Sequence, residues 1–178
     1  MNIYGEKTVI TGLEETDQPF LNSLINDPSI EHMTAGDSFP VSLACQEAWF
    51  HAHKGDCDPR RFAIRKIDDN EIVGMIYISQ IDLKNQKCST GIKIGGGYRV
   101  KGYARDAVNA LLNYLFNELN FNRVEAKILE YNVPSQKLYT KCGFVLEGRL
   151  RKTIYKKGLF RDQLVYSILK DEFNRTKE

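Results

Sequence analysis

Apolar residues follow a helical spacing most clearly after Ala104. They recur three and four positions apart, at Ala107, Val108, Leu111, Leu112, Leu115, Phe116 and Leu119. This spacing predicts a helix with one buried face. A candidate strand over residues 91–94 precedes it. A strand is therefore expected to lead through the glycine-rich turn at residues 95–97 into this helix.

The N-terminal part of the chain predicts one short strand and two helices. Residues 8–10 are expected to form the strand, and residues 17–26 the first helix, which Asn-Asp-Pro then ends. A second helix is expected over residues 41–53, and it should bury Leu43, Trp49 and Phe50. Residues 30–40, between the two helices, show no period and predict an irregular loop.

Later in the chain, strands alternate with one short helix. Two β-branched and aromatic stretches, residues 61–66 and 71–80, are joined by Asp68-Asp69-Asn70, which predicts a hairpin. The remaining elements are a helix over residues 133–141 and strands over residues 124–129, 144–146, 152–155 and 164–169. An antiparallel meander combined with crossover helices predicts a mixed sheet, in an α+β or layered α/β domain.

Composition narrows the class of protein. The 178 residues are 42% hydrophobic and 27% charged, as in an ordinary globular protein, and no repeat or linker interrupts them. One domain over residues 1–178 is expected. The formal net charge of +2 is too small to indicate nucleic-acid or membrane binding by itself.

The four cysteines are widely spaced and form no metal-ligand pattern with the three histidines, so we expect reduced thiols and no metal site. The first seven residues carry charges and no apolar run, which argues against a signal peptide. No stretch approaches the roughly 20 apolar residues of a membrane span. We therefore expect a cytoplasmic protein.

The glycine-rich turn lies where an anion would bind. Free backbone N–H groups and the helix dipole at a helix N-terminus favour a phosphate, and Arg99 and Lys101 add positive charge. Glycine in a strand-to-helix turn also occurs for geometry alone. By itself this turn does not decide between the two interpretations.

A second candidate site lies around the start of the helix over residues 133–141. Ser135 and Tyr139 are four positions apart and share a helix face, and Asn132 comes just before the helix. A tyrosine at such a site can donate a proton to a leaving group of similar pKa. The alternative is that Leu138 and Tyr139 only pack the helix against the sheet.

Together these segments resemble the GNAT superfamily of N-acetyltransferases. The run Arg99-x-x-Gly102-x-Ala104 matches the family's acetyl-CoA pyrophosphate signature, and Asn132-x-x-Ser135-x-x-x-Tyr139-x-Lys141-x-Gly143-Phe144 matches its second signature. The continuation Glu147-Gly148-Arg149-Leu150-Arg151 is similar to the branch of ribosomal-protein N-terminal (alanine) and spermidine acetyltransferases. The resemblance covers residues 8–169.

The resemblance implies a mixed, mostly antiparallel central sheet with helices on both faces and a cleft for CoA between two splayed strands. Acetyl-CoA would be the acetyl donor, with no metal. The residues expected to bind it are Ile92, Lys93, Ile94, Arg99, Val100, Lys101, Gly102, Tyr103, Ala104, Arg105, Asn132, Ser135 and Tyr139. Tyr139 would also protonate the departing thiolate. Because the amine would attack the thioester directly, Cys142 is expected only to pack.

Some positions depart from the family pattern. Ser89 stands where this branch often has a glutamate, which puts the general base in doubt. Glu31, Asp37 and Glu130 are the candidate substitutes, and each is also readily explained as a surface charge. Val100 stands where glycine is usual.

The acceptor amine stays open between a protein N-terminus, a polyamine and an amino sugar. A polyamine would need an acidic pocket, for which Glu31, Asp37 and Asp56 are candidates. A non-catalytic acyl-CoA-binding regulatory module is the alternative function. Nucleic-acid binding ranks last, since the basic stretch that would support it is more simply a solvated hairpin: Arg149, Arg151, Lys152, Lys156, Lys157 and Arg161. Sheets of this family often pair through edge strands, so a homodimer is an allowed assembly.

Overall fold

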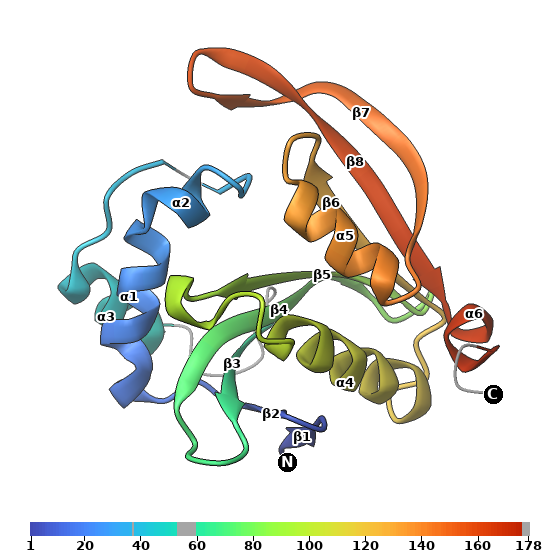
Figure 1. The fold of residues 1–178 in the computed structure, drawn as a ribbon, viewed down its shortest axis with the longest axis horizontal. Helices are drawn as coiled ribbons and strands as arrows, with labels where there is room; N and C mark the ends of the chain where they lie inside the picture. Colours follow the sequence, from blue (N-terminus) through green and yellow to red (C-terminus); the bar gives the residue numbers. More distant parts are fainter. Residues whose placement is uncertain (37, 53–59, 176–178) are drawn as a thin grey trace.

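A single sheet runs through the protein. The computed structural model describes residues 1–36, 38–52 and 60–175, and within these ranges the sheet has eight strands in the order β1-β2-β3-β4-β5-β6-β8-β7 (Figure 1). Neighbouring strands are antiparallel except β5 and β6, which are parallel. This confirms the expected mixed, mostly antiparallel sheet.

The predicted strands and helices occur in the predicted order, and β1, α2 and α6 are additional elements that were not predicted. The strands are β1 (Ile3–Tyr4), β2 (Thr8–Thr11), β3 (Arg60–Lys66), β4 (Ile72–Asp82), β5 (Lys87–Ile94), β6 (Arg123–Leu129), β7 (Val145–Lys156) and β8 (Leu159–Leu169). The α-helices are α1 (Gln18–Asn26), α2 (Pro28–Glu31), α3 (Leu43–Ala52), α4 (Tyr103–Asn117), α5 (Val133–Lys141) and α6 (Lys170–Arg175). Short 3₁₀ turns cover Glu15–Asp17 and Gly96–Tyr98.

Helices cover both faces of the sheet, as expected. Along β4, Ile76 and Ile78 belong to the main hydrophobic core together with the apolar face of α4. Met75 belongs to a second core with residues of α1 and α2, and Tyr77 packs against it from the same side of the strand. Because side chains alternate along a strand, β4 separates the two cores.

The buried face of α4 is the one that the apolar spacing predicts. Leu111, Leu112, Leu115 and Phe116 are at most 2% exposed. The last predicted position was wrong, since Leu119 is 45% exposed. The helix ends at Asn117, so Leu119 no longer follows the helical period.

Three other expectations need correction. Residues 30–40 were expected to be an irregular loop, but the first two belong to a short helix, α2. Asp27 caps this helix, and Pro28 is its first residue. Leu43 is exposed instead of buried, and Gln46 is the buried residue of α3. The expected end of that helix, His53, lies outside the described residues.

The third correction concerns the C-terminal strands. The separate strands expected over residues 144–146 and 152–155 are one strand, β7, which pairs with β8 through two irregularities in register. Its side chains are mostly exposed, so the residues between the two segments carry no apolar pattern. Backbone pairing with β8, which periodicity does not report, makes the strand continuous.

Strands β5 and β6 are paired over only part of their length. Their partners are Lys87 with Arg123, Cys88 with Val124, and Ser89 with Glu125. Beyond Ser89 the two strands separate, while β5 continues to pair with β4 as far as Ile94. The predicted splayed strands are therefore present, and their separation leaves backbone groups of both strands facing a cleft.

Candidate active site in the cleft between β5 and β6

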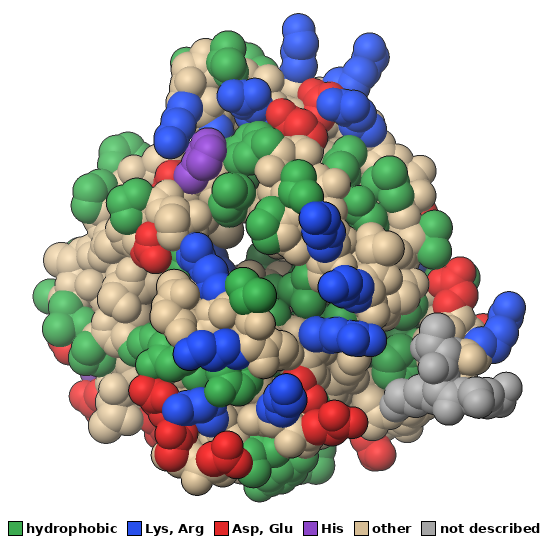
Figure 2. All heavy atoms as spheres, viewed as in Figure 1, with side chains coloured by type: hydrophobic (Ala, Val, Ile, Leu, Met, Phe, Trp, Pro, Cys, Tyr) green, Lys and Arg blue, Asp and Glu red, His purple; other side chains and the backbone are tan. Residues whose placement is uncertain are grey.

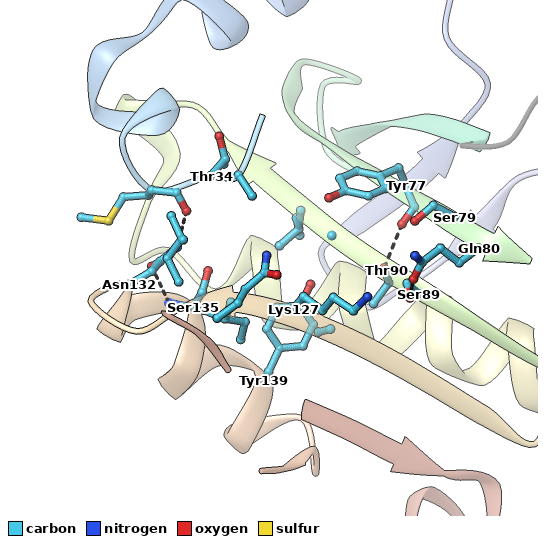
Figure 3. Close-up of a pocket in the computed structure, with 18 residues that line it drawn as sticks. Thr34, Tyr77, Ser79, Gln80, Ser89, Thr90, Lys127, Asn132, Ser135 and Tyr139 are labelled. Carbon is cyan, nitrogen blue, oxygen red and sulfur yellow. Dashed lines mark hydrogen bonds between the residues drawn. The ribbon is translucent and has the colours of Figure 1, made fainter. Parts of the chain in front are cut away.

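A cavity of about 260 Å³ occupies the place where the two strands separate. Its walls come from five regions: the loop after α2, strands β4 and β5, strand β6, helix α5 with the residue before it, and Gln163 of β8 (Figure 3). The surface of the protein is hollowed in the middle of the face shown in Figure 2, with Lys and Arg side chains on both sides of the hollow. The cavity thus joins elements that are far apart in the sequence.

Tyr139 reaches this cavity from α5. Its side chain is 3% exposed and packs edge-on against Phe144, with 4.9 Å between the ring centroids. Its ring points into the space between the strands (Figure 3), and its hydroxyl has no hydrogen-bond partner among the described residues. Burial, with smaller effects of Tyr77 and Cys142, raises the pKa of Tyr139 far above its usual value. The hydroxyl therefore keeps its proton at neutral pH and is available as a proton donor.

Asn132 and Ser135 line the same cavity but are already bonded to protein groups. The Asn132 Oδ1 accepts from the backbone N–H of Ser135 at 3.1 Å and so caps α5. The Asn132 Nδ2 donates to the carbonyl of Met33 at 2.9 Å. Asn132 thereby ties the loop after α2 to the start of α5, and its contact with acetyl-CoA stays a prediction.

The loop between β5 and α4 has the backbone conformation of an anion site. Val100 and Gly102 have φ values of 64° and 91°, and Gly102 is the residue before the first turn of α4. Positive φ is easy for Gly102 but strained for a β-branched valine. Strain of this kind is retained mainly where function needs the geometry. The first N–H groups of α4 have no partner within the helix, as at every helix N-terminus, and such groups favour an anion.

The basic side chains of that loop contact other protein groups. The Arg99 Nη2 donates to Ser29 Oγ at 3.0 Å and lies 4.0 Å from Asp27 Oδ2. Val100 is fully exposed, and the Lys101 ammonium lies 5.8 Å from the Tyr98 ring centroid. Recognition of the pyrophosphate would therefore rest on backbone N–H groups, as the resemblance implies.

The carboxylate of Asp106, in the first turn of α4, anchors the start of the helix to residues 6–8. The two oxygens of Asp106 accept hydrogen bonds from the backbone N–H groups of Glu6, Lys7 and Thr8 at 2.8–3.0 Å, and from Thr8 Oγ1 at 2.6 Å. Sequence reasoning missed this contact, because the two segments lie about a hundred positions apart. It fixes the start of α4 against the connection between β1 and β2.

Two hydroxyl groups and a tyrosine shape the cavity along β4 and β5. Ser89 Oγ donates to Gln80 Oε1 at 2.8 Å, and Thr90 Oγ1 donates to the Tyr77 carbonyl at 2.9 Å. The Tyr77 ring lies over Gly91 so closely that a Cβ there would be 2.2 Å from the hydroxyl. Glycine at position 91 is what allows Tyr77 to reach the cavity.

The loop after α2 is held over the cavity by the tip of the β7–β8 hairpin (Figure 1). The buried ammonium of Lys156 pairs with the Glu31 carboxylate and donates to Ser38 Oγ at 3.1 Å. Hydrogen bonds from Lys156 and Ser38 hold the pKa of Glu31 below its usual value. Tyr131 also donates to the carbonyl of His32 at 2.7 Å. These contacts set the cavity wall formed by Met33, Thr34 and Ala35.

No carboxylate lines the cavity among the described residues, and Lys127 is its one charged side chain. Of the candidate bases, Glu31 is engaged by Lys156, and Asp37 lies outside the described residues. Glu130 does not line the cavity; its Oε1 lies 3.8 Å from Arg161 Nη1. Asp56, considered for a polyamine site, also lies outside the described residues.

The two buried cysteines, Cys88 and Cys142, show no sign of nucleophilic activation. Burial raises the pKa of Cys88 to about 12 and that of Cys142 to about 11. Cys45 is exposed on α3, and Cys57 lies outside the described residues. Among the residues that the structure describes, no group of three metal-ligating side chains is found, and no helix combines the length and apolarity needed to cross a membrane.

Sequence reasoning placed four of the cavity residues, Ile92, Asn132, Ser135 and Tyr139. The predicted residues 99–105 form the loop and helix start beyond the end of β5 instead of the cavity wall. The residues that it missed come mainly from other strands and the α2 loop: Thr34, Tyr77, Gln80, Lys127 and Gln163. Their only sequence signal is a polar or tyrosine side chain within a strand or loop, which does not mark a site.

Comparisons with known proteins agree with this geometry. A family model for an acetyltransferase (GNAT) domain matches residues 7–145. The uncharacterized N-acetyltransferase p20 of Bacillus licheniformis is 37% identical over 173 residues, covering 96% of this chain and 97% of its own. The putative ribosomal N-acetyltransferase YdaF of Bacillus subtilis is 33% identical over 109 residues, covering 61% of this chain and 60% of its own. The crystal structure of spermidine N-acetyltransferase from Vibrio cholerae in complex with CoA and spermine has a TM-score of 0.86 at 25% identity, covering 94% of this chain and 98% of that chain.

The splayed strand pair, the loop before α4 and the buried tyrosine agree with the class that these comparisons show, that of CoA-dependent acetyltransferases. The chain belongs to the GNAT family of acetyltransferases. It is an N-acetyltransferase that takes the acetyl group from acetyl-CoA and transfers it to a primary amine.

Proposed function

We propose that the acceptor is a free α-amino group at the N-terminus of a peptide or protein, and that Tyr139 is the general acid of the transfer. The observation that carries this proposal is the cavity lining. A buried tyrosine hydroxyl without a partner lies in it, and no carboxylate does among the described residues.

The absence of a lining carboxylate within residues 1–36, 38–52 and 60–175 favours an amine that is already neutral. An α-amino group has a pKa near 7.7–8.0, whereas an alkylamine such as lysine has a pKa near 10.4. At pH 7.5 about a third of the first but only about 0.1% of the second is unprotonated. A site without a base therefore favours the α-amine by roughly two orders of magnitude, and Lys127 further disfavours a polycation.

The transfer is proposed as a direct attack. The amine nitrogen bonds to the thioester carbonyl carbon, the carbon–sulfur bond breaks, and the amine proton leaves to solvent. The proton of the Tyr139 hydroxyl goes to the departing sulfur, and the phenolate that this leaves takes up a proton from solvent before the next turnover. Burial holds that proton on the tyrosine until the thiolate forms, because it disfavours the phenolate. No cysteine takes part, in agreement with the raised pKa values of both buried thiols.

The donor would be held mainly by the backbone. Residues 99–104 would bind the pyrophosphate through N–H groups, and the unpaired edge of β5 at Ile92, Lys93 and Ile94 would pair with the pantetheine amides. Arg105, exposed in the first turn of α4, would reach the nucleotide phosphate. Ser135 and Asn132 would complete the wall on the α5 side.

A polyamine is the second candidate acceptor, favoured by the structural similarity to the spermidine N-acetyltransferase of Vibrio cholerae. A polyamine carries several positive charges and would need carboxylates close to the cavity. Glu31 lies just before the loop that lines the cavity, and Lys156 already pairs with it.

A panel of amines read by CoA-thiol release tests the proposal. It contains a peptide with a free α-amine, the same peptide with its N-terminus blocked and a lysine inside, spermidine and glucosamine. We expect the free peptide to have the highest kcat/KM at pH 7.5. Its kcat/KM should rise with pH and level off near the pKa of the peptide amine, since the neutral amine is the reacting form.

Faster turnover of spermidine than of every peptide would reject the α-amine in favour of the polyamine. Binding of acetyl-CoA without thiol release for any amine would instead support the non-catalytic regulatory module. Isothermal titration with acetyl-CoA alone separates these outcomes from loss of folding.

A further inference from the structure

Arg61 and Lys93 do not line the cavity themselves, but they lie on the same face of the sheet as two residues that do. Arg61 on β3 pairs with Tyr77 on β4, which in turn pairs with Gly91 on β5. Tyr77 and Gly91 both line the cavity. Lys93 is two positions beyond Gly91 on the same strand, so it projects from the same face.

Both cations are partly buried and lack a carboxylate partner among the described residues. The Arg61 guanidinium lies 4.3 Å from the ring centroid of Trp49, and Lys93 forms no hydrogen bond or ion pair within the described part of the chain. Burial lowers the pKa of both groups, and the charges of Arg61 and Lys156 lower that of Lys93 further.

Not every basic side chain on this face lacks a carboxylate partner. Arg65 on β3 has a buried carboxylate partner, Asp17, with Nη2 to oxygen distances of 2.6 and 2.7 Å. The negative charge of Glu31 raises the pKa of Lys93, but Glu31 itself pairs with Lys156. Partly buried charges without a partner are unfavourable, and an anion placed between them would relieve that cost.

We propose that Arg61 and Lys93 form an anion subsite for the acceptor, so that the preferred acceptors carry a carboxylate or phosphate close to the reacting amine. The proposal rests on the proposed function and narrows its substrate class. Gly91 and Lys93 are separated by about 7 Å along the strand. A group bound there belongs to the first or second residue of a peptide whose α-amine lies near Tyr139.

Three peptides that differ only at the second position test this subsite: Ser-Glu-Ala-Ala-Tyr, Ser-Gln-Ala-Ala-Tyr and Ser-Lys-Ala-Ala-Tyr, all amidated. A fourth peptide with phosphoserine at the second position distinguishes phosphate from carboxylate. We expect kcat/KM for an acidic peptide to exceed that for the glutamine peptide by roughly 10- to 100-fold, the range for a charge-assisted hydrogen bond in a partly buried site. The lysine peptide should be the poorest acceptor.

For the variants, the quantity compared is the ratio of kcat/KM for the acidic peptide to kcat/KM for the glutamine peptide. A ratio is used because Lys93 also belongs to the predicted acetyl-CoA site, so its replacement could change both values together. Arg61→Met and Lys93→Met should each reduce this ratio at least several-fold, and Lys93→Arg should restore part of it. Lys87→Met is the matched control, since Lys87 is exposed on the same strand and face, six residues away. It should leave the ratio unchanged.

Peptides that are acetylated without any dependence on charge would overturn the subsite and leave the proposed function intact. A preference for acidic peptides that persists in both methionine variants would also overturn it. If the variants instead change the choice between acetyl-CoA and succinyl-CoA, the anion belongs to the donor and the assignment is wrong. Absence of turnover with every peptide, with acetyl-CoA still bound in calorimetry, would reject the proposed function itself.

Discussion

Tyr139 combines the two properties that a proton donor to a thiolate needs. It is buried where the strands separate, and its hydroxyl has no partner among the described residues. Phe144 and the wall of α5 fix the ring, so the hydroxyl does not have to be ordered when substrate arrives. The direction of its pKa shift keeps the proton available throughout the physiological range.

Replacing Tyr139 by phenylalanine removes the hydroxyl and keeps the ring. We expect Tyr139→Phe to lower kcat by roughly 10²–10⁴ and to change the dissociation constant of acetyl-CoA little. Stopped-flow or steady-state thiol release measures the first, and calorimetry the second. Tyr131→Phe, which removes a hydroxyl bonded to the His32 carbonyl, serves as a comparison. Unchanged turnover in Tyr139→Phe would remove the tyrosine from the role.

Glu147 on β7 links stability to pH. It accepts from Arg123 Nη1 at 2.8 Å, and hydrogen bonds from Arg123 and then Ser167 lower the pKa of Glu147 to about 2. A carboxylate whose pKa is lowered by folding stabilises the protein above its unfolded pKa of about 4.3. That contribution is lost as the pH falls from about 4.3 through about 2.

We therefore expect Glu147→Gln to flatten the loss of unfolding free energy between pH 4.5 and 2, because glutamine does not titrate. Urea unfolding at a series of pH values measures it. Glu118→Gln, at an exposed position after α4, is the control. An identical pH profile for Glu147→Gln and the unaltered protein would contradict the linkage.

Among the secondary-structure elements, the β7–β8 hairpin has a role beyond closing the sheet. Its tip reaches the loop after α2 through Lys156, whose side chain is 4% exposed. Two other basic side chains of the hairpin also lie near carboxylates: Arg149 pairs with Asp162, and Arg161 lies 3.8 Å from Glu130. Half of the basic stretch is thus engaged within the protein.

Removing the ammonium should loosen the cavity wall. We expect Lys156→Met to destabilise the protein by about 1–3 kcal/mol, since Glu31 and Ser38 lose a partner in a mostly buried place. The KM for the acceptor should rise several-fold, with acetyl-CoA affinity nearly unchanged. Chemical unfolding and steady-state kinetics measure these effects.

Lys157→Met, one residue further in the exposed turn, is the matched control for Lys156→Met. A double variant with Glu31→Gln should cost less than the sum of the single variants, because the two groups contact each other. Additive losses would show that the pair does not hold the loop.

Helix α4 depends on a contact that its own sequence does not reveal. In Asp106→Asn one of the two accepting oxygens becomes an NH₂ group, so either the bond from the N–H of Glu6 or the bonds from those of Lys7 and Thr8 are lost. We expect a loss of about 2–4 kcal/mol of unfolding free energy and weaker acetyl-CoA binding. Thr8→Val, which removes only the hydroxyl bond, should cost about 1 kcal/mol. Equal losses in the two variants would contradict this anchoring role.

For the molecule as a whole, binding of the donor should appear as stabilisation. The site is assembled from the β5–α4 loop, both splayed strands and α5, so acetyl-CoA binds the folded chain and not the unfolded one. At a hundred times its dissociation constant it should add about 2.7 kcal/mol. For a chain of this size that corresponds to roughly 5–10 °C in the midpoint of thermal unfolding.

Differential scanning fluorimetry with acetyl-CoA and with acetyl-pantetheine measures this stabilisation. Acetyl-pantetheine lacks the pyrophosphate and should shift the midpoint less at equal concentration. Equal shifts would show that the loop at residues 99–104 contributes no phosphate binding.

Strand β7, at one edge of the sheet, is where a second copy of the chain could pair. Strand β7 has no partner on its outer side among the described residues, and the hairpin exposes several large apolar side chains: Val145, Leu146, Leu150, Tyr155, Leu159 and Phe160. A homodimer through this edge stays a prediction.

Local patterns in the sequence determined the elements around the donor site. The apolar period of α4, the capped start of α5 at Asn132 and the two signatures depend on neighbours within one turn or one loop, so they are visible without a fold. They predicted the family, the splayed strands and Tyr139. They missed the end of α4 and the continuity of β7, where tertiary pairing outweighs propensity.

Only the tertiary structure decided the acceptor side. Strand register brings Tyr77 over Gly91 and puts Arg61 and Lys93 on one face, while Lys156 finds Glu31 across 125 positions of sequence. Such contacts depend on which strands pair and how far long side chains reach, and no local period encodes either. The sequence therefore determined what the protein transfers, and the packing of distant segments determined the surroundings that the acceptor meets.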